Sequence, residues 1–426
     1  MSALRVETAE EMESLEDFRQ RARSFIRGNL RQVTPEELRW ERNSNDDEAE
    51  LATVSRDREI QRMLFDAGLA GICFPREYGG QGLTYEHQKV LNEEFVGYEY
   101  PLRVQIPTLS PCAAVILEFG THEQKLRHLP AILKGEELWM QFLSEPSGGS
   151  DVAGALTTAV RDGEQWILNG SKVWTSGAWW SDWGLCLART NWDQPKHRGL
   201  TVFMLPIHQP NVEVHRIEMN NGSREFCQEF MTDVIVPDAD RVGAVDEGWT
   251  VGTRWMFHER MLYNSAYVTE PVGLAHGSQD AKIVYDIARQ HGRLDDATAR
   301  QNIGEARMLE LVVSQLAERV GEGIRTERMS DQAAALVRLF KGSSVSRVVT
   351  LAFDNAGASG AAWTEDDAAS MSAINFLMRQ AGSIGGGTTE MARNVISERV
   401  LGMPRERRLD KDVPFRDVPR SRPTSP

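Results

Sequence analysis

The spacing of the apolar residues changes twice along this chain of 426 residues, and that change constrains its fold more than any other feature. Before about residue 138 apolar side chains recur at helical spacing, as in Leu15, Phe18, Ala22, Phe25 and Ile26. From about 139 to 245 short alternating runs are separated by turns, and Asp162-Gly163 between two of them is typical of a β-hairpin. After Gly248 the helical spacing returns.

This order predicts an α+β chain with more than one domain, because its length exceeds what a single hydrophobic core usually supports. We expect a helical domain at 1–138, a middle β domain, a barrel or a sandwich, at 139–245, and a C-terminal helical bundle at 246–409. Residues 410–426 contain four prolines among charged residues, and we expect them to form a flexible tail.

The composition argues against several classes of function. A net charge of −14 and a pI of about 5.3 disfavour nucleic acid and anionic membranes as main partners. No apolar run approaches the roughly 18 residues of a membrane span, so no membrane insertion is expected. The N-terminus lacks the basic region and apolar stretch of a signal peptide, so we expect a cytoplasmic protein.

The cysteines and the common nucleotide motifs add further constraints. The four cysteines are widely spaced and form no CxxC pair, so neither a zinc site nor a disulfide framework is expected. The chain also lacks GxGxxG, GxxxxGK and GxSxG. Any cofactor must therefore be bound by a different arrangement of residues.

Two segments of the middle region carry residues suited to ligand binding. Residues 144–151, SEPSGGSD, combine close backbone approach at two glycines with the hydroxyls of Ser144 and Ser150. Residues 172–178, KVWTSGA, place Trp174 near Ser176, so that an indole can cover a flat ligand while a hydroxyl reaches its rim. The alternatives are a turn that enters a strand and a tryptophan of the core.

A third segment, 384–394, reads IGGGTTEMARN. Three glycines before a helical pattern expose backbone N–H groups, which favour a phosphate or a carbonyl oxygen. The alternative is a glycine linker whose helix is capped by Thr388 or Thr389, with Glu390 in its first turn.

The fourth candidate is Glu259 in WMFHERMLYNSA, which falls on the apolar face of an expected helix. A buried carboxylate is costly unless it is paired, so its position needs a reason. One reason is catalysis, and the alternative is a structural ion pair, for example with Arg260.

These segments, in this order, resemble the acyl-CoA dehydrogenase family over about residues 58–405. Each match is weak alone, and their common order with matching gaps is the strong signal. The resemblance rests on FPREYGGQGL (74–83), GTHEQKLRHLPAILKGE (120–136), SEPSGGSDVAG (144–154), WILNGSKVWTSGA (166–178), VIVPDADRVG (234–243) and ISERVLGMPRE (396–406).

The resemblance implies that the bundle has four helices and that FAD sits between it and the β domain. Leu143 and Ser144 match positions at the pyrimidine side of the flavin, and Ser150 follows them in the same segment. Trp174 matches the aromatic residue beside the isoalloxazine, and Ser176 matches a hydroxyl near flavin N5. Two positions in the glycine segment match residues that line the FAD, namely Thr388 and Glu390.

The family removes the α-proton of an acyl-CoA thioester with a carboxylate while a hydride leaves the β-carbon, which gives a trans-2-enoyl-CoA. Many members carry this base at the position of Gly386, which has no side chain here. Another group, the isovaleryl and long-chain type, places it on the first bundle helix before an arginine, as in Glu259-Arg260. We therefore expect Glu259 and Arg260 to be catalytic and the backbone N–H of Gly386 to hold the thioester carbonyl.

The chain departs from the family at the adenosine end of the flavin. An RxxFG motif of relatives reads ARQHG here (288–292), with Ala288 and His291 in place of Arg and Phe, and a QxxGGxG-like loop reads DNAGASG (354–360). Either the grip on FAD is altered, or a sister subunit supplies part of the site. Mixed tetramers of this kind occur among actinobacterial relatives that handle bulky, steroid-derived CoA thioesters.

The resemblance leaves other functions open. A flavin monooxygenase of the same fold is one alternative, and Glu259 argues against it because such enzymes lack the base. A non-catalytic partner subunit is another, which Ala288 favours and which Trp174, Ser176 and Glu259 oppose. For the dehydrogenase, the family implies a homo- or hetero-oligomer and electron-transfer flavoprotein as the acceptor.

Overall fold

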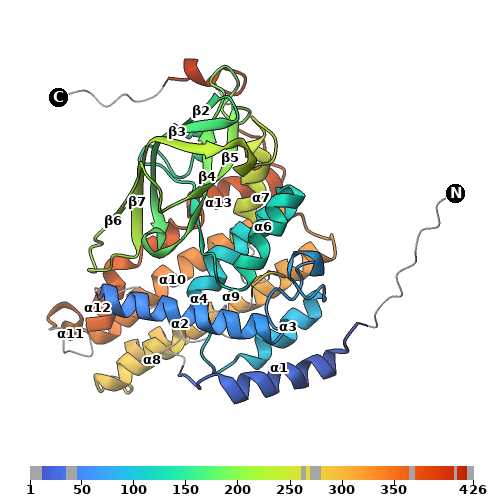
Figure 1. Cartoon of the computed structure of the whole chain (residues 1–426). Coiled ribbons are helices and arrows are strands. Elements are labelled where there is room, and N and C mark those ends of the chain that lie inside the picture. The colour runs from blue at the N-terminus through green and yellow to red at the C-terminus, as the bar shows by residue number, and fades with distance from the viewer. Residues whose placement is uncertain are drawn as a thin grey trace.

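The computed structural model describes residues 12–34, 46–260, 265–268, 280–363, 370–406 and 410–419. It has the expected fold class, with helices before and after a β-sheet (Figure 1). The sequence TPEE at 34–37 is typical of a helix start, and residues 35–45 lie outside the described part of the chain.

The first part of the chain is helical, as expected. Its main α-helices are α1 (Leu15–Asn29), α2 (Asp47–Asp66), α3 (Tyr85–Glu94), α4 (Leu102–Val104), α5 (Ala114–Phe119) and α6 (His122–Leu133). A π-helical segment, η2 (Gln105–Ala113), joins α4 to α5. Side-chain oxygens of Ser14, Asp46 and Thr121 accept N–H groups at the starts of α1, α2 and α6, because the first turn of a helix leaves these donors unpaired.

The middle of the chain forms a mixed sheet of eight strands among the described residues, ordered β6-β7-β3-β2-β4-β5-β8, with β1 beside β4. The strands are β1 (Trp139–Phe142), β2 (Thr158–Asp162), β3 (Gln165–Ser176), β4 (Trp183–Arg189), β5 (Leu200–Pro206), β6 (Val212–Arg216), β7 (Phe226–Pro237) and β8 (Arg241–Val242). Strands β2 and β3 form the hairpin predicted from Asp162-Gly163, and Gly163 takes the positive φ of +61° that a tight turn requires.

Helices return after β8. The main α-helices are α7 (Gly248–Arg260), α8 (Asp280–Gln290), α9 (Ala297–Arg325), α10 (Ala334–Ala356), α11 (Ala358–Ala361), α12 (Ser370–Met378) and α13 (Thr389–Val395). Two buried hydrogen bonds join α8, α9 and α10. Asn302 of α9 donates to the side chain of Asn355 on α10, which donates to the carbonyl of Val284 on α8. Burial of such polar groups is tolerated because they are hydrogen-bonded.

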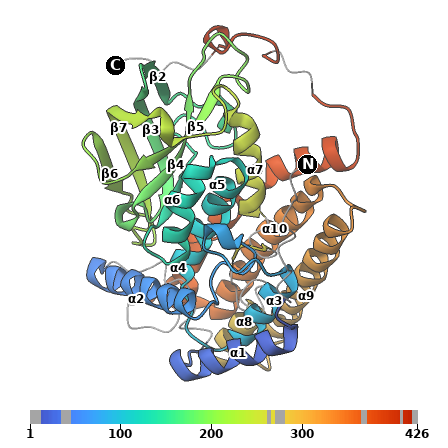
Figure 2. The ribbon, with the colours of Figure 1, turned by 45° about the vertical axis from the view of Figure 1, so that its right-hand side comes forward.

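Helix α7 links the sheet to the helices of the first part of the chain. It lies against α5, η2 and β5 (Figure 2). Trp255 of α7 is fully buried, and its indole N–H donates to the side chain of Gln141 on β1 over 2.6 Å. The last turn of α7, which carries Glu259, is thereby fixed beside the sheet.

The expected loose tail is corrected for its described part, residues 410–419. Phe415 is buried, stacks on Trp192 with 5.4 Å between ring centroids, and lies under the guanidinium of Arg189. Its N–H donates to the carbonyl of Gln194. One large aromatic residue therefore docks this segment on the β domain, although prolines and charges surround it.

Candidate functional site

A buried ion pair joins the two polar segments of the β domain. The ammonium of Lys172 on β3 lies 2.9 Å from the carboxylate of Glu145, and their side chains are 0% and 4% exposed. Lys172 also donates to the carbonyl of Leu143, and Glu145 accepts the N–H groups of Leu156 and Thr157. Burial works against ionisation, yet Lys172 and these donors hold the pKa of Glu145 below its ordinary value.

This pair places Leu143 and Ser144 beside β3. The N–H of Val173 donates to the carbonyl of Ser144 over 2.9 Å, so the first motif runs next to the second. Leu143 and Ser144 are half-buried at this junction, whereas Ser150 is exposed. Sequence reasoning missed Glu145 and Lys172, although both lie inside the motifs and a charged pair there was the available signal.

Trp174 combines an unusual backbone conformation with an exposed side chain. It has a φ of +67°, at an irregularity of β3 between Val173 and Thr175, and its side chain is 53% exposed. A left-handed backbone is costly for a residue with a side chain and concentrates at functional sites. The indole packs edge-on against Phe226, and Ser176 is half-buried two residues further along. Trp174 is therefore not a core residue, and an exposed indole beside a hydroxyl fits a flat aromatic group.

The side chain of Thr175, which lies between Trp174 and Ser176, points into the sheet instead. Thr175 donates to the carboxylate of Glu229 on β7 over 2.9 Å, and Glu229 is fully buried. Burial raises the pKa of Glu229 to about 8, against the opposing effects of the Thr175 hydroxyl and of Lys172. The inner face of β3 thus carries a polar network directly beneath the candidate flavin contacts.

The glycine segment is mostly exposed and enters α13. Gly386 and Gly387 have φ values of +70° and +93°, which glycine adopts without strain. The hydroxyl of Thr388 accepts the N–H of Met391 over 3.1 Å, so Thr388 is the cap of this helix. Glu390 in the first turn is exposed and lies 3.4 Å from Arg393.

Glu259 faces this glycine segment. A Cβ atom placed on Gly386 would lie 3.9 Å from Oε1 of Glu259, so the carboxylate stands close to where a side chain at 386 would begin. Burial, and after it the charge of Glu259, raises the pKa of the Cys112 thiol on η2. The structure therefore brings together Glu259 and Gly386. The side chain of Arg260 lies outside the described residues.

A second ion cluster holds the end of α7 that carries Glu259. Glu118 of α5 accepts from Arg254 over 2.9 and 2.8 Å and contacts Nε2 of His258 at 2.7 Å. Burial alone would raise the pKa of Glu118, yet the hydrogen bonds from Arg254 and His258 lower it to about 2. The hydroxyl of Ser110 also donates to the carbonyl of His258. Sequence reasoning missed this cluster because its members are far apart in the chain.

The two segments that depart from the family lie together at one end of the bundle. Arg293, just after 288–292, donates to the carbonyls of Asp354 and Asn355. Ala288 is fully buried, so the family's arginine position is occupied here by a small core residue.

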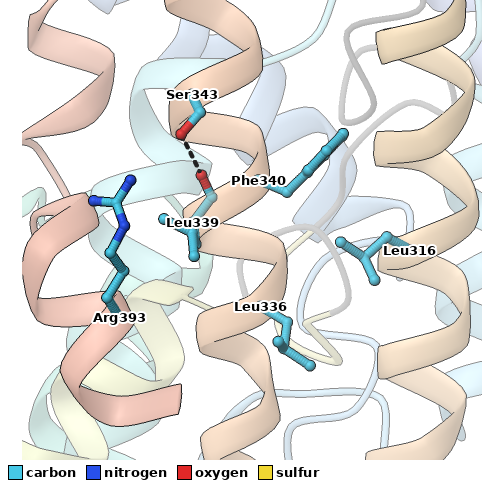
Figure 3. Close-up of a pocket in the computed structure, with 6 residues that line it drawn as sticks. All are labelled: Leu316, Leu336, Leu339, Phe340, Ser343 and Arg393. Atoms are coloured by element: carbon cyan, nitrogen blue, oxygen red, sulfur yellow. Dashed lines mark hydrogen bonds between the residues drawn. The ribbon is translucent and has the colours of Figure 1, made fainter. Parts of the chain in front are cut away.

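A separate apolar pocket of about 290 Å³ lies between α9, α10 and α13 (Figure 3). None of the candidate site residues lines it. It is bordered by Leu316, Leu336, Leu339, Phe340, Ser343 and Arg393.

Comparison with known proteins identifies the family of the chain. Three family models match: the acyl-CoA dehydrogenase N-terminal domain (residues 12–136), middle domain (141–234) and C-terminal domain (246–401). The acyl-CoA dehydrogenase IpdE1 of Mycobacterium tuberculosis is 31% identical over 93% of this chain and 99% of its own length. The acyl-CoA dehydrogenase FadE26 of the same organism is 30% identical, over 92% of this chain and 98% of its own.

Two solved structures have a similar fold. The Tcur3481-Tcur3483 steroid ACAD has a TM-score of 0.73 at 26% identity, and covers 93% of this chain and 99% of its own. The ChsE4-ChsE5 complex from Mycobacterium tuberculosis has a TM-score of 0.71 at 25% identity, and covers 94% of this chain and 100% of its own. Within the described residues no helix is long and apolar enough to cross a membrane. The chain belongs to the acyl-CoA dehydrogenase family of flavoprotein oxidoreductases.

Proposed function

We propose that the protein catalyses the FAD-dependent α,β-dehydrogenation of an acyl-CoA thioester to the trans-2-enoyl-CoA, with Glu259 as the base. One observation carries the proposal: the Glu259 carboxylate lies next to the side-chain position of Gly386, where many relatives have their base. A carboxylate from α7 can therefore act on the region that a glutamate at 386 would reach.

The residues of the β domain and of the glycine segment fit a flavin. The exposed indole of Trp174, the hydroxyls of Ser144, Ser150 and Ser176, and Leu143 would hold FAD from the β domain. Thr388 and Glu390 would border it from the bundle side. When bound, FAD supplies an acceptor for the hydride that leaves the β-carbon of the substrate.

The chain's own residues account for the proton. Glu259 takes the α-proton, and the backbone N–H of Gly386 donates to the thioester carbonyl. A thioester α-proton is a far weaker acid than a carboxylic acid, so the negative charge that develops on the carbonyl oxygen needs such a donor. Substrate binding would exclude water from the half-buried Glu259 and make it a stronger base. We assign Arg260 to the same catalytic pair because of its position in the sequence.

The test is the variant Glu259→Gln, which keeps shape but cannot accept the proton. We expect unchanged flavin content and a fall in the rate of flavin reduction by acyl-CoA of roughly 10²–10⁴-fold. Glu305→Gln is the matched control, because Glu305 is a surface carboxylate of α9 that pairs with Arg347. Reduction of Glu259→Gln at the wild-type rate would reject Glu259 as the base.

We further propose that the natural substrate is bulky, such as a steroid-derived CoA thioester, and that the chain works in a homo- or hetero-oligomer with electron-transfer flavoprotein as acceptor. Support comes from the likeness to the steroid ACAD and to the ChsE4-ChsE5 complex, and from Ala288. The acidic composition and the four free cysteines suit the cytoplasm.

The visible spectrum of the chain purified alone tests the assembly. A flavin spectrum near full occupancy means that the chain binds FAD without a sister subunit. A protein that stays colourless after FAD is added assigns the activity to a complex, or makes this chain the non-catalytic partner. Steroid-derived and straight-chain acyl-CoA substrates are then compared by flavin bleaching, and equal bleaching by both contradicts a dedicated bulky-substrate enzyme.

A further inference from the structure

An arginine of the bundle donates hydrogen bonds to the backbone of the glycine segment. Arg338 on α10 donates from Nη1 to the carbonyl of Gly382 over 3.0 Å and from Nη2 to the carbonyl of Gly385 over 2.6 Å. Such charge-assisted hydrogen bonds are about twice as strong as neutral ones. The segment carries almost no side chains of its own at 385–387, so this contact from outside fixes where it lies.

A glycine on α10 makes room for this arginine. A Cβ atom on Gly342, one turn after Arg338, would lie 2.5 Å from Nη1 of Arg338 and 3.1 Å from the carbonyl oxygen of Gly382. Any side chain there would displace the guanidinium or the loop. Neither Arg338 nor Gly342 lines the apolar pocket of Figure 3, to which α10 contributes Leu336, Leu339, Phe340 and Ser343.

The same arginine and Glu259 both approach the side-chain position of Gly386. A Cβ atom on Gly386 would have Nε of Arg338 at 3.8 Å and Oε1 of Glu259 at 3.9 Å, so both groups approach one point. The thiol of Cys112 on η2 also feels the charge of Glu259, and the ring nitrogen of the neighbouring His258 contacts Glu118. Arg254 is directed to Glu118 as well. Arg338 of α10 therefore places a positive charge on the side of the Glu259 carboxylate that faces Gly386.

The peptide that Arg338 holds also contains the proposed carbonyl donor. The C=O of Gly385 and the N–H of Gly386 belong to one peptide unit, and in a trans peptide they point in opposite directions. A cation on the C=O therefore aims the N–H away from Arg338 and polarises it, which makes it a stronger donor.

We infer that Arg338 is a positioning residue, which orients and polarises the 385–386 peptide and favours the ionised form of Glu259. This inference rests on the proposed function, since it concerns the base and the carbonyl donor of that reaction. The competing possibility is that Arg338 only anchors the loop.

The test compares Arg338→Gln and Arg338→Lys with the control Arg347→Gln, an exposed arginine on the same helix paired with Glu305. The rate of flavin reduction by acyl-CoA is measured against pH. For Arg338→Gln we expect the acidic limb of the rate–pH profile to move to higher pH by about one unit, because the Glu259 carboxylate loses a neighbouring positive charge. Arg338→Lys should keep the wild-type limb with a lower plateau, since a lysine holds only one carbonyl well. Arg347→Gln should match wild type.

A second readout needs neither substrate nor flavin. Urea unfolding midpoints of wild type, Arg338→Gln, Glu259→Gln and the double variant form a cycle. We expect Arg338→Gln to lower the midpoint clearly less in the Glu259→Gln background than in wild type. Additive shifts together with an unmoved acidic limb would overturn the inference and leave a loop anchor only.

The two proposals fail in different ways. If Glu259→Gln remains active, the proposed base is wrong, whereas the cycle still reports whether Arg338 and Glu259 interact. If Arg338→Gln does not fold, Gly342→Ala replaces it, because that methyl group displaces the guanidinium while its charge remains. We then expect a lower plateau of the rate, and a wild-type plateau in Gly342→Ala would count against Arg338 as a positioning residue.

Discussion

The two sides of the candidate site are built in different ways. On the β-domain side, the segments that carry Ser144 and Trp174 are tied together by the fully buried Lys172 and its partner Glu145. On the bundle side, the glycines at 385–387 are exposed, and Arg338 of α10 donates to the carbonyl of Gly385. One side owes its shape to a buried polar network, and the other to a contact with exposed backbone.

This difference predicts where stability and catalysis separate. Removing one member of a buried charge pair leaves the other uncompensated, so a change on the β side should cost folding energy as well as flavin binding. A change in the exposed glycine segment removes little buried contact, so it should cost rate more than stability. Variants on each side can therefore break or sharpen the comparison.

The largest effect is expected for Lys172→Met. It leaves the Glu145 carboxylate buried without its cation, which should lower the free energy of unfolding by about 3–5 kcal/mol. Urea unfolding and the flavin-to-protein ratio measure this. The control is Lys282→Met, whose lysine forms an exposed pair on α8 and should cost less than about 1 kcal/mol. Equal losses in the two variants would contradict the role of the buried pair.

An intermediate and pH-dependent effect is expected for Glu229→Gln. Burial raises the pKa of Glu229 to about 8 from the ordinary 4.5, so the folded state holds this proton through a range where the unfolded state has lost it. Wild-type stability should therefore fall as pH rises from about 5 to 8, by at most on the order of 1 kcal/mol per pH unit. The variant has no proton to lose, so its melting temperature should fall less over that range.

The control for this prediction is Glu213→Gln on β6, an exposed residue whose replacement should leave the wild-type pH dependence intact. Parallel melting curves for Glu229→Gln and wild type from pH 5 to 8 would show that Glu229 does not hold its proton in the folded protein.

The smallest effect on stability is expected for Gly386→Ala. A φ of +70° costs a residue with a side chain about 1–2 kcal/mol, and relief of that strain turns the N–H away from the substrate. We expect a slower flavin reduction and a small shift of the unfolding midpoint. Gly163→Ala is the control, because this hairpin glycine has a φ of +61° with open space around it and is remote from the site. A rate loss in Gly163→Ala equal to that in Gly386→Ala would contradict a specific role of the glycine segment in the reaction.

Much of the fold could be predicted from the sequence. The return of helical spacing after Gly248 is confirmed by helices such as α9 and α10, and the hairpin at Asp162-Gly163 is confirmed. The division at 138/139 and 245/246 that we propose falls between α6 and β1 and between β8 and α7. The tail was the exception, because the burial of Phe415 depends on a surface formed by distant residues such as Arg189.

For the candidate site, local pattern determined which segments to examine. The glycines of 384–387, the Trp174 segment and Glu259 on an apolar helix face stand out because spacing and residue type are visible in the chain itself. Only the tertiary structure decided which charges meet: Lys172 with Glu145, Glu118 with Arg254, and Arg338 with the carbonyls beside Gly386. The reason is physical, since periodicity reports burial along one element, whereas the partner of a charge depends on how several elements pack together.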